Sequence, residues 1–109
     1  MSGTGFLVDG IDAGNKKFQR QFGKLDPPVR AEAMERLAGI VRVAAFNPAW
    51  HVHEFPTTLV TSASDPDKKV KVWTMHLTSN KQWKASFTLE GGIAYFRVCG
   101  SHQDVDAAP

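Results

Sequence analysis

The segment Val70–His102 most constrains what this chain can fold into, because it reads as three consecutive β-strands joined by short turns. Its β-branched and aromatic residues predict strands over about 70–78, 82–90 and 93–98. Ser79-Asn80-Lys81 predicts the first turn. Gly91-Gly92 predicts a two-residue hairpin turn, because both positions adopt positive φ at little cost. Strands joined this closely must pair antiparallel.

Side chains alternate between the two faces of a strand, so each predicted strand has an apolar and a more polar side. The apolar side carries Trp73, Met75, Leu77, Trp83, Ala85, Phe87, Leu89, Ala94, Phe96 and Val98. The polar side carries His76, Lys84, Ser86, Tyr95, Arg97 and Cys99. Because the apolar sides must be coplanar to form one core, the polar residues gather on the opposite face. That face suits a phosphate-bearing partner, or it is the ordinary solvated face of an antiparallel sheet.

Two helices are predicted before these strands. Asn15 is a good cap for a helix over Lys16–Leu25, and Asp26 with Pro27 begins a second helix that runs to about Ala45. Because the link between them is so short, we expect an antiparallel helical hairpin. Gly5–Asp9 is a candidate first strand.

The remaining segments are expected to be irregular. Pro48 and Pro56 keep helix out of Phe46–Thr58, where only residues 52–55 suit extended backbone, and Asp104–Pro109 is expected to fray. The order predicts one domain over residues 1–109, of α+β class, with a two-helix hairpin packed on one face of a small antiparallel sheet. The predicted core comprises Phe18, Phe22, Leu37, Val41, Trp73, Leu77, Phe87 and Phe96.

Composition narrows the function classes only partly. The 109 residues carry a formal net charge of +2, which permits an anionic partner without requiring one. The single cysteine, Cys99, excludes an intramolecular disulfide framework and is expected to be inert. His51 and His53 share one face of an extended segment, but exposed histidines are favoured over a metal site there. No segment reads as a signal peptide or membrane helix, so we expect a cytoplasmic protein.

Three segments resemble the RelE/ParE superfamily of type II toxin–antitoxin toxins. They are FQRQFGKLDPPVRAEAMERLAGIV, similar to the family's helical hairpin; HVHEF, similar to the segment before its sheet; and HLT with KQWKASFTLEGGIAYFRVCGSHQDV, similar to its "Y-R-I" and "G-x-H" strands. The resemblance spans about Phe6–Val105. It implies a RelE-like fold and a metal-free, ribosome-dependent endoribonuclease that cleaves mRNA and inhibits translation. It also implies no cofactor, no membrane, and a cognate antitoxin that covers the basic face or clasps the helices.

The resemblance further implies site residues. Lys84 matches the Arg of "Y-R-I", Arg97 the Arg of the last strand and His102 the His of "G-x-H", while His76 falls where a basic residue is common. His102, with His76 second, would transfer protons as a ribose 2′-OH attacks the adjacent phosphate. Lys84 and Arg97 would stabilise the charge that develops. Candidate substrate-binding residues are Lys81, Ser86, Tyr95 and Asp104, and Asp104 either orients His102 or lies in a solvated tail.

Two departures from the family pattern concern activity more than fold. Lys84 keeps the charge of the family's Arg but loses its bidentate phosphate geometry. Asp106 follows Val105 where an aromatic residue is common, so Trp50, Trp83 or Tyr95 would have to stack a base. The alternatives are a ParE-like protein that inhibits DNA gyrase without enzymatic activity, or a RelE-fold protein that has lost toxicity. His76 and His102 favour the ribonuclease, because ParE-like members tend to lack such a set.

Overall fold

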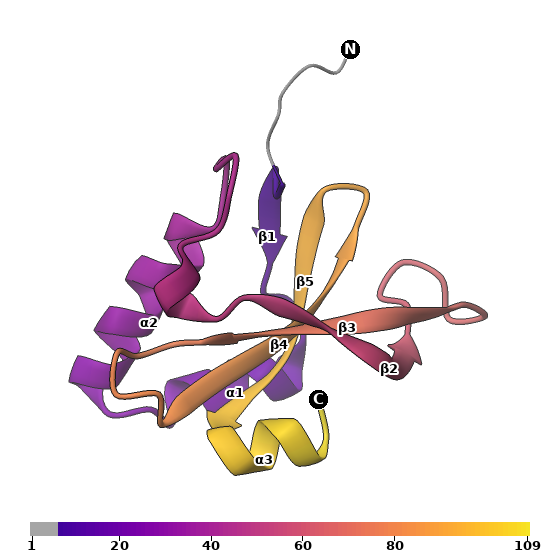
Figure 1. The fold of residues 1–109 in the computed structure, drawn as a ribbon. Coiled ribbons are helices and arrows are strands. Elements are labelled where there is room, and N and C mark those ends of the chain that lie inside the picture. The colour runs from indigo at the N-terminus through magenta and orange to yellow at the C-terminus, as the bar shows by residue number, and fades with distance from the viewer. Residues whose placement is uncertain (1–6) are drawn as a thin grey trace.

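The structure is a computed structural model that describes residues 7–109 (Figure 1). Its elements in chain order are β1 (Gly10–Asp12), α1 (Lys16–Gly23), α2 (Pro27–Gly39), a 3₁₀ turn η1 (Pro48–Trp50), β2 (His53–Thr61), β3 (Lys69–His76), β4 (Trp83–Glu90), β5 (Ile93–Ser101) and α3 (His102–Ala107). The described chain is therefore of α+β class, as predicted. None of its helices is long and apolar enough to cross a membrane.

The strands form one mixed sheet in the order β1-β5-β4-β3-β2. The central pairs β3–β4 and β4–β5 are antiparallel, which confirms the predicted meander. Gly91 and Gly92 both have positive φ, 59° and 82°, as the hairpin turn requires. The sheet is not wholly antiparallel, however, because β1 pairs parallel with β5. The prediction of a strand at Gly5–Asp9 was wrong for the described residues, since β1 begins at Gly10, and residues 5 and 6 lie outside them.

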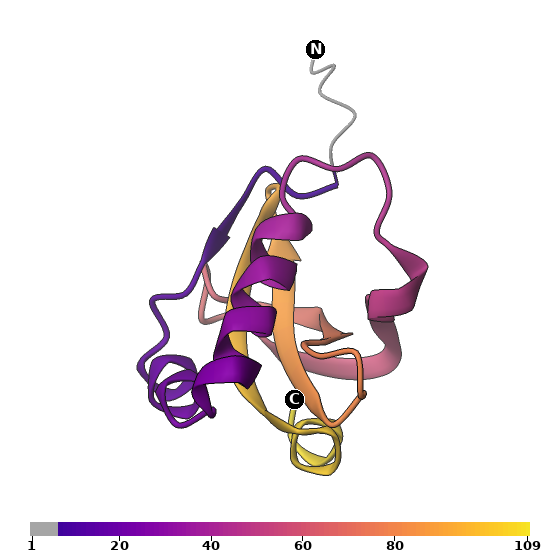
Figure 2. The same cartoon turned by 90° about the vertical axis from the view of Figure 1, so that its left-hand side faces the viewer.

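Helices α1 and α2 both pack on one face of the sheet (Figure 2). The hydrophobic core lies between these helices and the sheet. It contains Val8, Phe18, Leu25, Ala33, Leu37, Ile40, Met75, Leu77, Ala85, Phe87, Ala94, Phe96 and Cys99. Phe22, Val41 and Trp73 are partly buried against it. The eight predicted core residues therefore all belong to this core or its margin.

The predicted antiparallel helical hairpin was wrong. In Figure 2, α1 is seen end-on while α2 stands upright, so the two helices cross. Helix α2 also stops at Gly39 instead of running to Ala45. Arg42 has a positive φ of 62°, and its backbone N–H donates to the Val8 carbonyl, while the Val43 carbonyl accepts from Leu7. These bonds to the N-terminal segment replace the helical ones.

A β-bulge in β5 changes which face the last residues occupy. Ser86 pairs with Val98 but Phe87 pairs with Phe96, so Arg97 is the extra residue. Strict alternation predicted Val98 in the core and Cys99 outside it. Beyond the bulge the faces exchange: Cys99 pairs with Ala85 and joins the core, and Val98 lies beside Ser86 on the other face.

Two segments expected to be irregular are ordered. The edge strand β2 runs through Pro56, with an irregular register between Glu54 and Leu59. Proline is tolerated there because an edge strand has one unpaired side. The expected frayed tail is instead helix α3, which Ser101 caps by accepting a hydrogen bond from the Asp104 N–H.

Helix α3 closes the sheet face that the sequence predicted to be open. Val105 of α3 is buried, and Lys84, Ser86 and Thr88 of β4 are buried on the face turned away from the core. The Pro109 carbonyl accepts hydrogen bonds from Ser86 Oγ at 2.9 Å and Arg97 Nε at 3.1 Å. The chain's own C-terminal segment therefore covers the part of this face that carries Lys84, Ser86 and Arg97.

Candidate functional site

Three histidines from separate parts of the chain lie against one another. His76 ends β3, His51 follows the 3₁₀ turn η1, and His102 begins α3. The ring centroids of His51 and His76 are 4.7 Å apart, and those of His76 and His102 are 5.3 Å apart. We call these three residues the histidine cluster. His76 is its buried centre, with 6% of its surface exposed, whereas His51 is exposed and His102 partly exposed.

Asp106 connects the histidine cluster to a buried lysine. Its Oδ1 lies 2.6 Å from Lys84 Nζ and its Oδ2 lies 3.0 Å from His102 Nδ1. His102 and Asp106 are i and i+4 on α3, the spacing that places two side chains on one face of a helix. The Lys84 side chain is only 4% exposed, so this carboxylate provides the counter-charge that burial of an ammonium requires.

The surroundings of His76 keep its imidazole neutral. Burial, followed by the nearby positive charge of His51, Lys84, His102 and Lys81, lowers the pKa of His76 from 6.5 to about 4. Its Nδ1 is buried without a hydrogen-bond partner. Buried polar atoms of this kind are uncommon and mark either strain or a functional role. At neutral pH His76 is therefore an uncharged imidazole and a weak proton acceptor.

Helix α2 and the η1 turn fix the cluster in place. Arg36 Nη1 donates to the His76 carbonyl at 3.1 Å, and its guanidinium lies 5.7 Å from the Trp50 ring. Glu32 accepts a hydrogen bond from the Ser79 N–H just beyond β3. The 3₁₀ turn that carries Trp50 is capped by Asn47, and the next residue, His51, takes a left-handed conformation with φ 51°. This conformation lets the chain reverse so that His51 meets His76.

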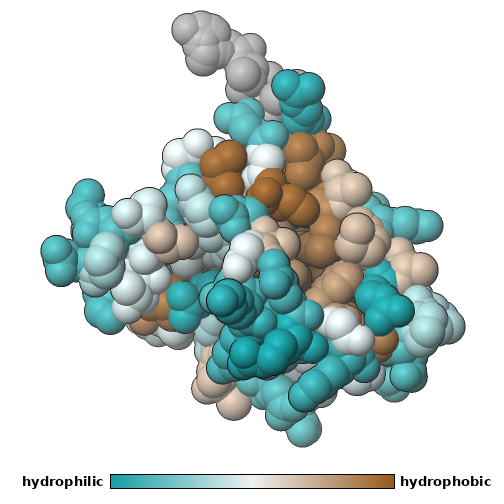
Figure 3. All heavy atoms as spheres, turned by 180° about the vertical axis from the view of Figure 1, so that it is seen from behind, coloured by the Kyte–Doolittle hydropathy of each residue, from teal (hydrophilic) through white to brown (hydrophobic). Residues whose placement is uncertain are grey.

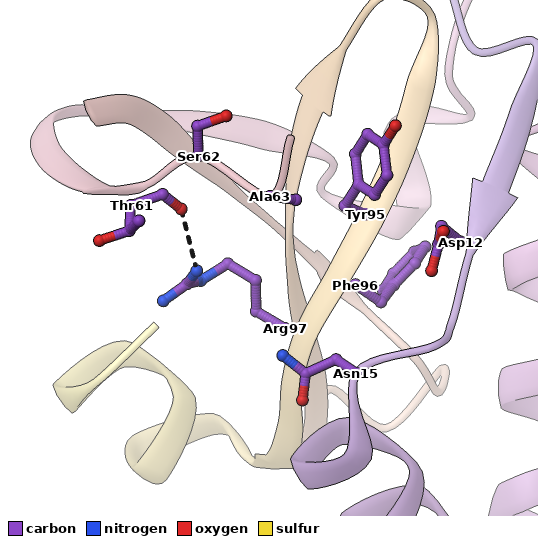
Figure 4. A pocket seen from close by; sticks show the side chains of 8 residues that line it. All are labelled: Asp12, Asn15, Thr61, Ser62, Ala63, Tyr95, Phe96 and Arg97. Atoms are coloured by element: carbon purple, nitrogen blue, oxygen red, sulfur yellow. Dashed lines mark hydrogen bonds between the residues drawn. The ribbon is translucent and has the colours of Figure 1, made fainter. Parts of the chain in front are cut away.

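The structure thus brings together three of the four predicted catalytic residues, His76, His102 and Lys84, and separates the fourth. We expected Arg97 beside Lys84 on an open face, but Lys84 pairs with Gly100, three residues further along β5. Arg97 is half-buried and burial lowers its pKa. It donates from Nε to the Pro109 carbonyl and from Nη1 to the Thr61 carbonyl at 3.5 Å (Figure 4).

Arg97 and Tyr95 belong to a different hollow, a pocket of about 410 Å³ between β5, the end of β2 and the start of α1. Figure 4 shows Tyr95 and Arg97 side by side on β5, with Asp12 and Asn15 across from them. Both facing residues are already engaged, since Asp12 accepts from the Gly14 N–H and Asn15 caps α1. Arg97 and Tyr95 therefore do not share a site with the histidine cluster.

The other candidate substrate-binding residues are scattered. Ser86 is fully buried and bonded to Pro109, and the prediction that it lies on an accessible surface was wrong. Asp104 is exposed on α3, but its neighbour Asp106 is the carboxylate that contacts His102. Lys81 is exposed at the 79–81 turn, near enough to affect the pKa of His76.

Two residues of the site were missed from the sequence. His51 was assigned to an exposed pair with His53, because nothing local to it indicates a distant partner. Asp106 was assigned to a frayed tail, although the His102-to-Asp106 spacing would have indicated the contact once a helix was assumed. Cys99 is buried in the core, and burial raises its pKa to about 12, so its thiol is unreactive at neutral pH. Within residues 7–109, no three His, Cys, Asp or Glu side chains are arranged to hold a metal ion.

A second surface lies between β1, α1 and α2, where an apolar pocket of about 370 Å³ is lined by Ile11, Ala13, Phe18, Gln19, Phe22, Gly23, Met34, Leu37 and Ala38. Seen from behind, the molecule has an apolar area with strongly hydrophilic surface next to it (Figure 3). Ile11 and Met34 are large apolar side chains left exposed here.

Comparisons of the chain with models of protein families, with curated proteins and with solved structures gave no match.

Proposed function

We propose that this chain is a RelE-like toxin of a type II toxin–antitoxin system, a ribosome-dependent endoribonuclease that cleaves mRNA. The observation that carries the proposal is the proximity of His76, His102 and Lys84, three residues to which the family resemblance gives catalytic roles. The α+β architecture, with two helices on one face of a small sheet, is compatible with a RelE-like fold.

The residues of the cluster match the needs of RNA cleavage by a ribose 2′-OH. The reaction forms a bond from the 2′ oxygen to phosphorus, breaks the bond to the 5′ oxygen, and transfers one proton from the first oxygen and one to the second. His102 is partly exposed, and its Nδ1 is held by Asp106, which leaves the other ring nitrogen for proton transfer. His76 is neutral and a weak base, which leaves His102 as the main proton-transfer group, and Lys84 supplies positive charge for the phosphorane.

His51 adds a third imidazole to this set. It is exposed, and its ring centroid lies 4.7 Å from that of His76. Because His76 is only 6% exposed, His51 is a second candidate, beside His102, for the histidine that contacts the substrate. Separate His51, His76 and His102 variants distinguish these roles.

The test is cell-free translation with the purified chain, followed by primer extension on the mRNA. We expect cleavage within translated regions, slowed about 10²–10⁴-fold by His102→Ala, the range for loss of a proton-transfer group. His53→Gln is the matched control, because His53 is an exposed histidine of β2 outside the cluster. Intact cleavage in a His76→Gln, His102→Ala double variant would reject the ribonuclease. Loss of gyrase supercoiling activity without mRNA cleavage would instead support the ParE-like alternative.

A toxin of this kind also needs a cognate antitoxin. The apolar pocket between β1, α1 and α2 suits an amphipathic segment of such a partner, and α1 presents exposed Lys16, Lys17 and Arg20 near it. Opposite charge would steer an acidic segment to this surface and make the association rate sensitive to salt. Co-expression with the neighbouring small reading frame should restore growth, and a failure to do so would argue against the partner.

A further inference from the structure

One carboxylate, that of Asp106, contacts both a buried lysine and a histidine of the cluster. Its two oxygens are divided between Lys84 Nζ at 2.6 Å and His102 Nδ1 at 3.0 Å. A phosphoryl group offers the same arrangement, two anionic oxygens on one centre, and binds the same donors through charge-assisted hydrogen bonds. The geometry around Asp106 is therefore that of an anion site with an anion already in it.

We propose that Lys84, His76 and His102 form a binding site for a phosphoryl group, and that the chain's own Asp106 occupies this site in the structure. The inference rests on the proposed function for its physiological ligand, the phosphodiester of an RNA. The chemistry of the site does not depend on that choice, since free phosphate and a nucleic-acid backbone offer the same oxygens.

The burial of Lys84 and His76 supports a preformed anion-binding site. Lys84 has a side chain only 4% exposed, beneath Asp106 of α3. A lysine serving only solubility would extend into water, because burying an ammonium is costly. His76, 6% exposed, keeps an unpartnered Nδ1 beside these groups. A buried cation and a buried unsatisfied imidazole together mark a place where a polar ligand lowers the free energy.

Asp106, which occupies the proposed site, belongs to the short helix α3. Helix α3 has six residues, too few to be stable by itself, and it depends on the Ser101 cap, on buried Val105 and on Asp106. The Asp106 side chain is 36% exposed, so its carboxylate can rotate into water without unfolding the sheet. Substrate phosphate and Asp106 therefore compete for the same donors, and α3 restrains the site until an anion displaces it.

Binding of inorganic phosphate to Asp106→Asn tests the competition directly. The Asn side chain keeps an oxygen for Lys84 but removes the competing charge. We expect the dissociation constant for phosphate, followed by NMR shifts of the histidine ring protons, to fall about tenfold, equivalent to about 1.4 kcal/mol. Phosphate should also raise the Tm of this variant more than that of the unaltered chain, because a ligand stabilises the state that binds it.

Asp67→Asn is the matched control, since it removes the same charge from an exposed position in the loop between β2 and β3. It should change the phosphate affinity by less than about twofold because an exposed charge is screened. A Lys84→Gln, Asp106→Asn double variant should lose the gain. If Asp106→Asn folds poorly, Asp106→Ser, which also removes the competing charge, should show the same direction.

A deoxyoligonucleotide, which lacks the 2′-OH and cannot be cleaved, separates the two sources of phosphate. Binding tighter than that of free phosphate assigns the site to a nucleic-acid backbone, and equal binding per phosphate assigns it to a free phosphate ligand. If Asp106→Asn leaves both affinities unchanged, or lowers them, Asp106 only orients His102 and the proposal is wrong. A gain in affinity without any mRNA cleavage would retain the phosphoryl site and reject the ribonuclease.

Discussion

The indole ring of Trp50 lies directly on Gly39, so closely that a β-carbon at position 39 would overlap its Cη2 and Cζ3 atoms. The last residue of α2 must therefore be glycine for η1 to dock on the helix. Because His51 follows Trp50, this contact also determines where His51 meets His76. The absence of a β-carbon at Gly39 therefore affects both the packing of α2 and the geometry of the candidate site.

Gly39→Ala should displace Trp50 and loosen the histidine cluster. We expect a loss of about 1–3 kcal/mol in the free energy of unfolding, the cost of overpacking. This outweighs the roughly 1 kcal/mol by which alanine is preferred over glycine in a helix. Gly23→Ala is the control, because nothing lies within 4 Å of a β-carbon there, and it should be neutral or stabilising. Urea unfolding of both variants measures the difference, and equal stabilities would contradict the contact.

His76 should make the chain less stable in mild acid. Its pKa is about 4 in the folded chain against an ordinary 6.5, so between these values the unfolded chain binds a proton that the folded chain does not. The free energy of unfolding should fall as the pH drops from 6.5 to 4, by on the order of 2 kcal/mol, with no further contribution below. His76→Gln should flatten this window of the stability profile, whereas His53→Gln should leave it unchanged.

Much of the architecture could be predicted, because the Val70–His102 pattern is local. The Gly91-Gly92 turn and the alternation of β3 and β4 follow from neighbouring residues, and the structure bears them out. The bulge at Arg97 was not predictable from alternation. One extra residue exchanges Val98 and Cys99 between faces, and neither side chain is unusual on either side of a sheet.

The candidate site was only half predictable for a similar reason. His76 and Lys84 lie on paired strands, so alternation and register place them together. His51 and Asp106 reach the site through a left-handed residue and a short helix, and these depend on tertiary contacts with Gly39, Val105 and Lys84. Local propensity carries little information about such contacts, since a six-residue helix does not form alone.

Glu90 should stabilise the loop after β2, and this stabilisation should be lost at a lower pH than that of His76. Burial raises its pKa, but hydrogen bonds from Ser62, Thr88, the Ala63 N–H and Ser64 lower it to about 2, from 4.5. This stabilisation is present above pH 4.5 and should be lost as the pH falls toward 2, on the order of 1–3 kcal/mol with allowance for solvent screening. Glu90→Gln should remove this window. Glu54→Gln, which breaks the exposed pair with Lys71, should retain it.

Arg97→Ala should affect stability more than cleavage. Arg97 anchors the C-terminal segment through Pro109 and lies outside the histidine cluster, so we expect a loss of about 1 kcal/mol of stability. The rate constant for cleavage should fall much less than in His102→Ala, for which loss of a proton-transfer group predicts about 10²–10⁴-fold. Single-turnover cleavage beside thermal unfolding distinguishes the two effects. A loss for Arg97→Ala as large as that for His102→Ala would return Arg97 to the catalytic set.

The Lys84–Asp106 pair should respond unequally to removal of its two members. Asp106→Ala leaves an ammonium with a 4% exposed side chain and no counter-charge, and should cost on the order of 3 kcal/mol. Lys84→Met leaves a carboxylate that is 36% exposed and able to bind water, and should cost less than about 1 kcal/mol, because methionine fills the same space. The double variant should recover most of the loss, since no buried charge then remains. Lys71→Met, at the exposed pair with Glu54, should change stability by less than about 1 kcal/mol. Equal losses for Asp106→Ala and Lys84→Met would mean that α3 does not keep Lys84 from water.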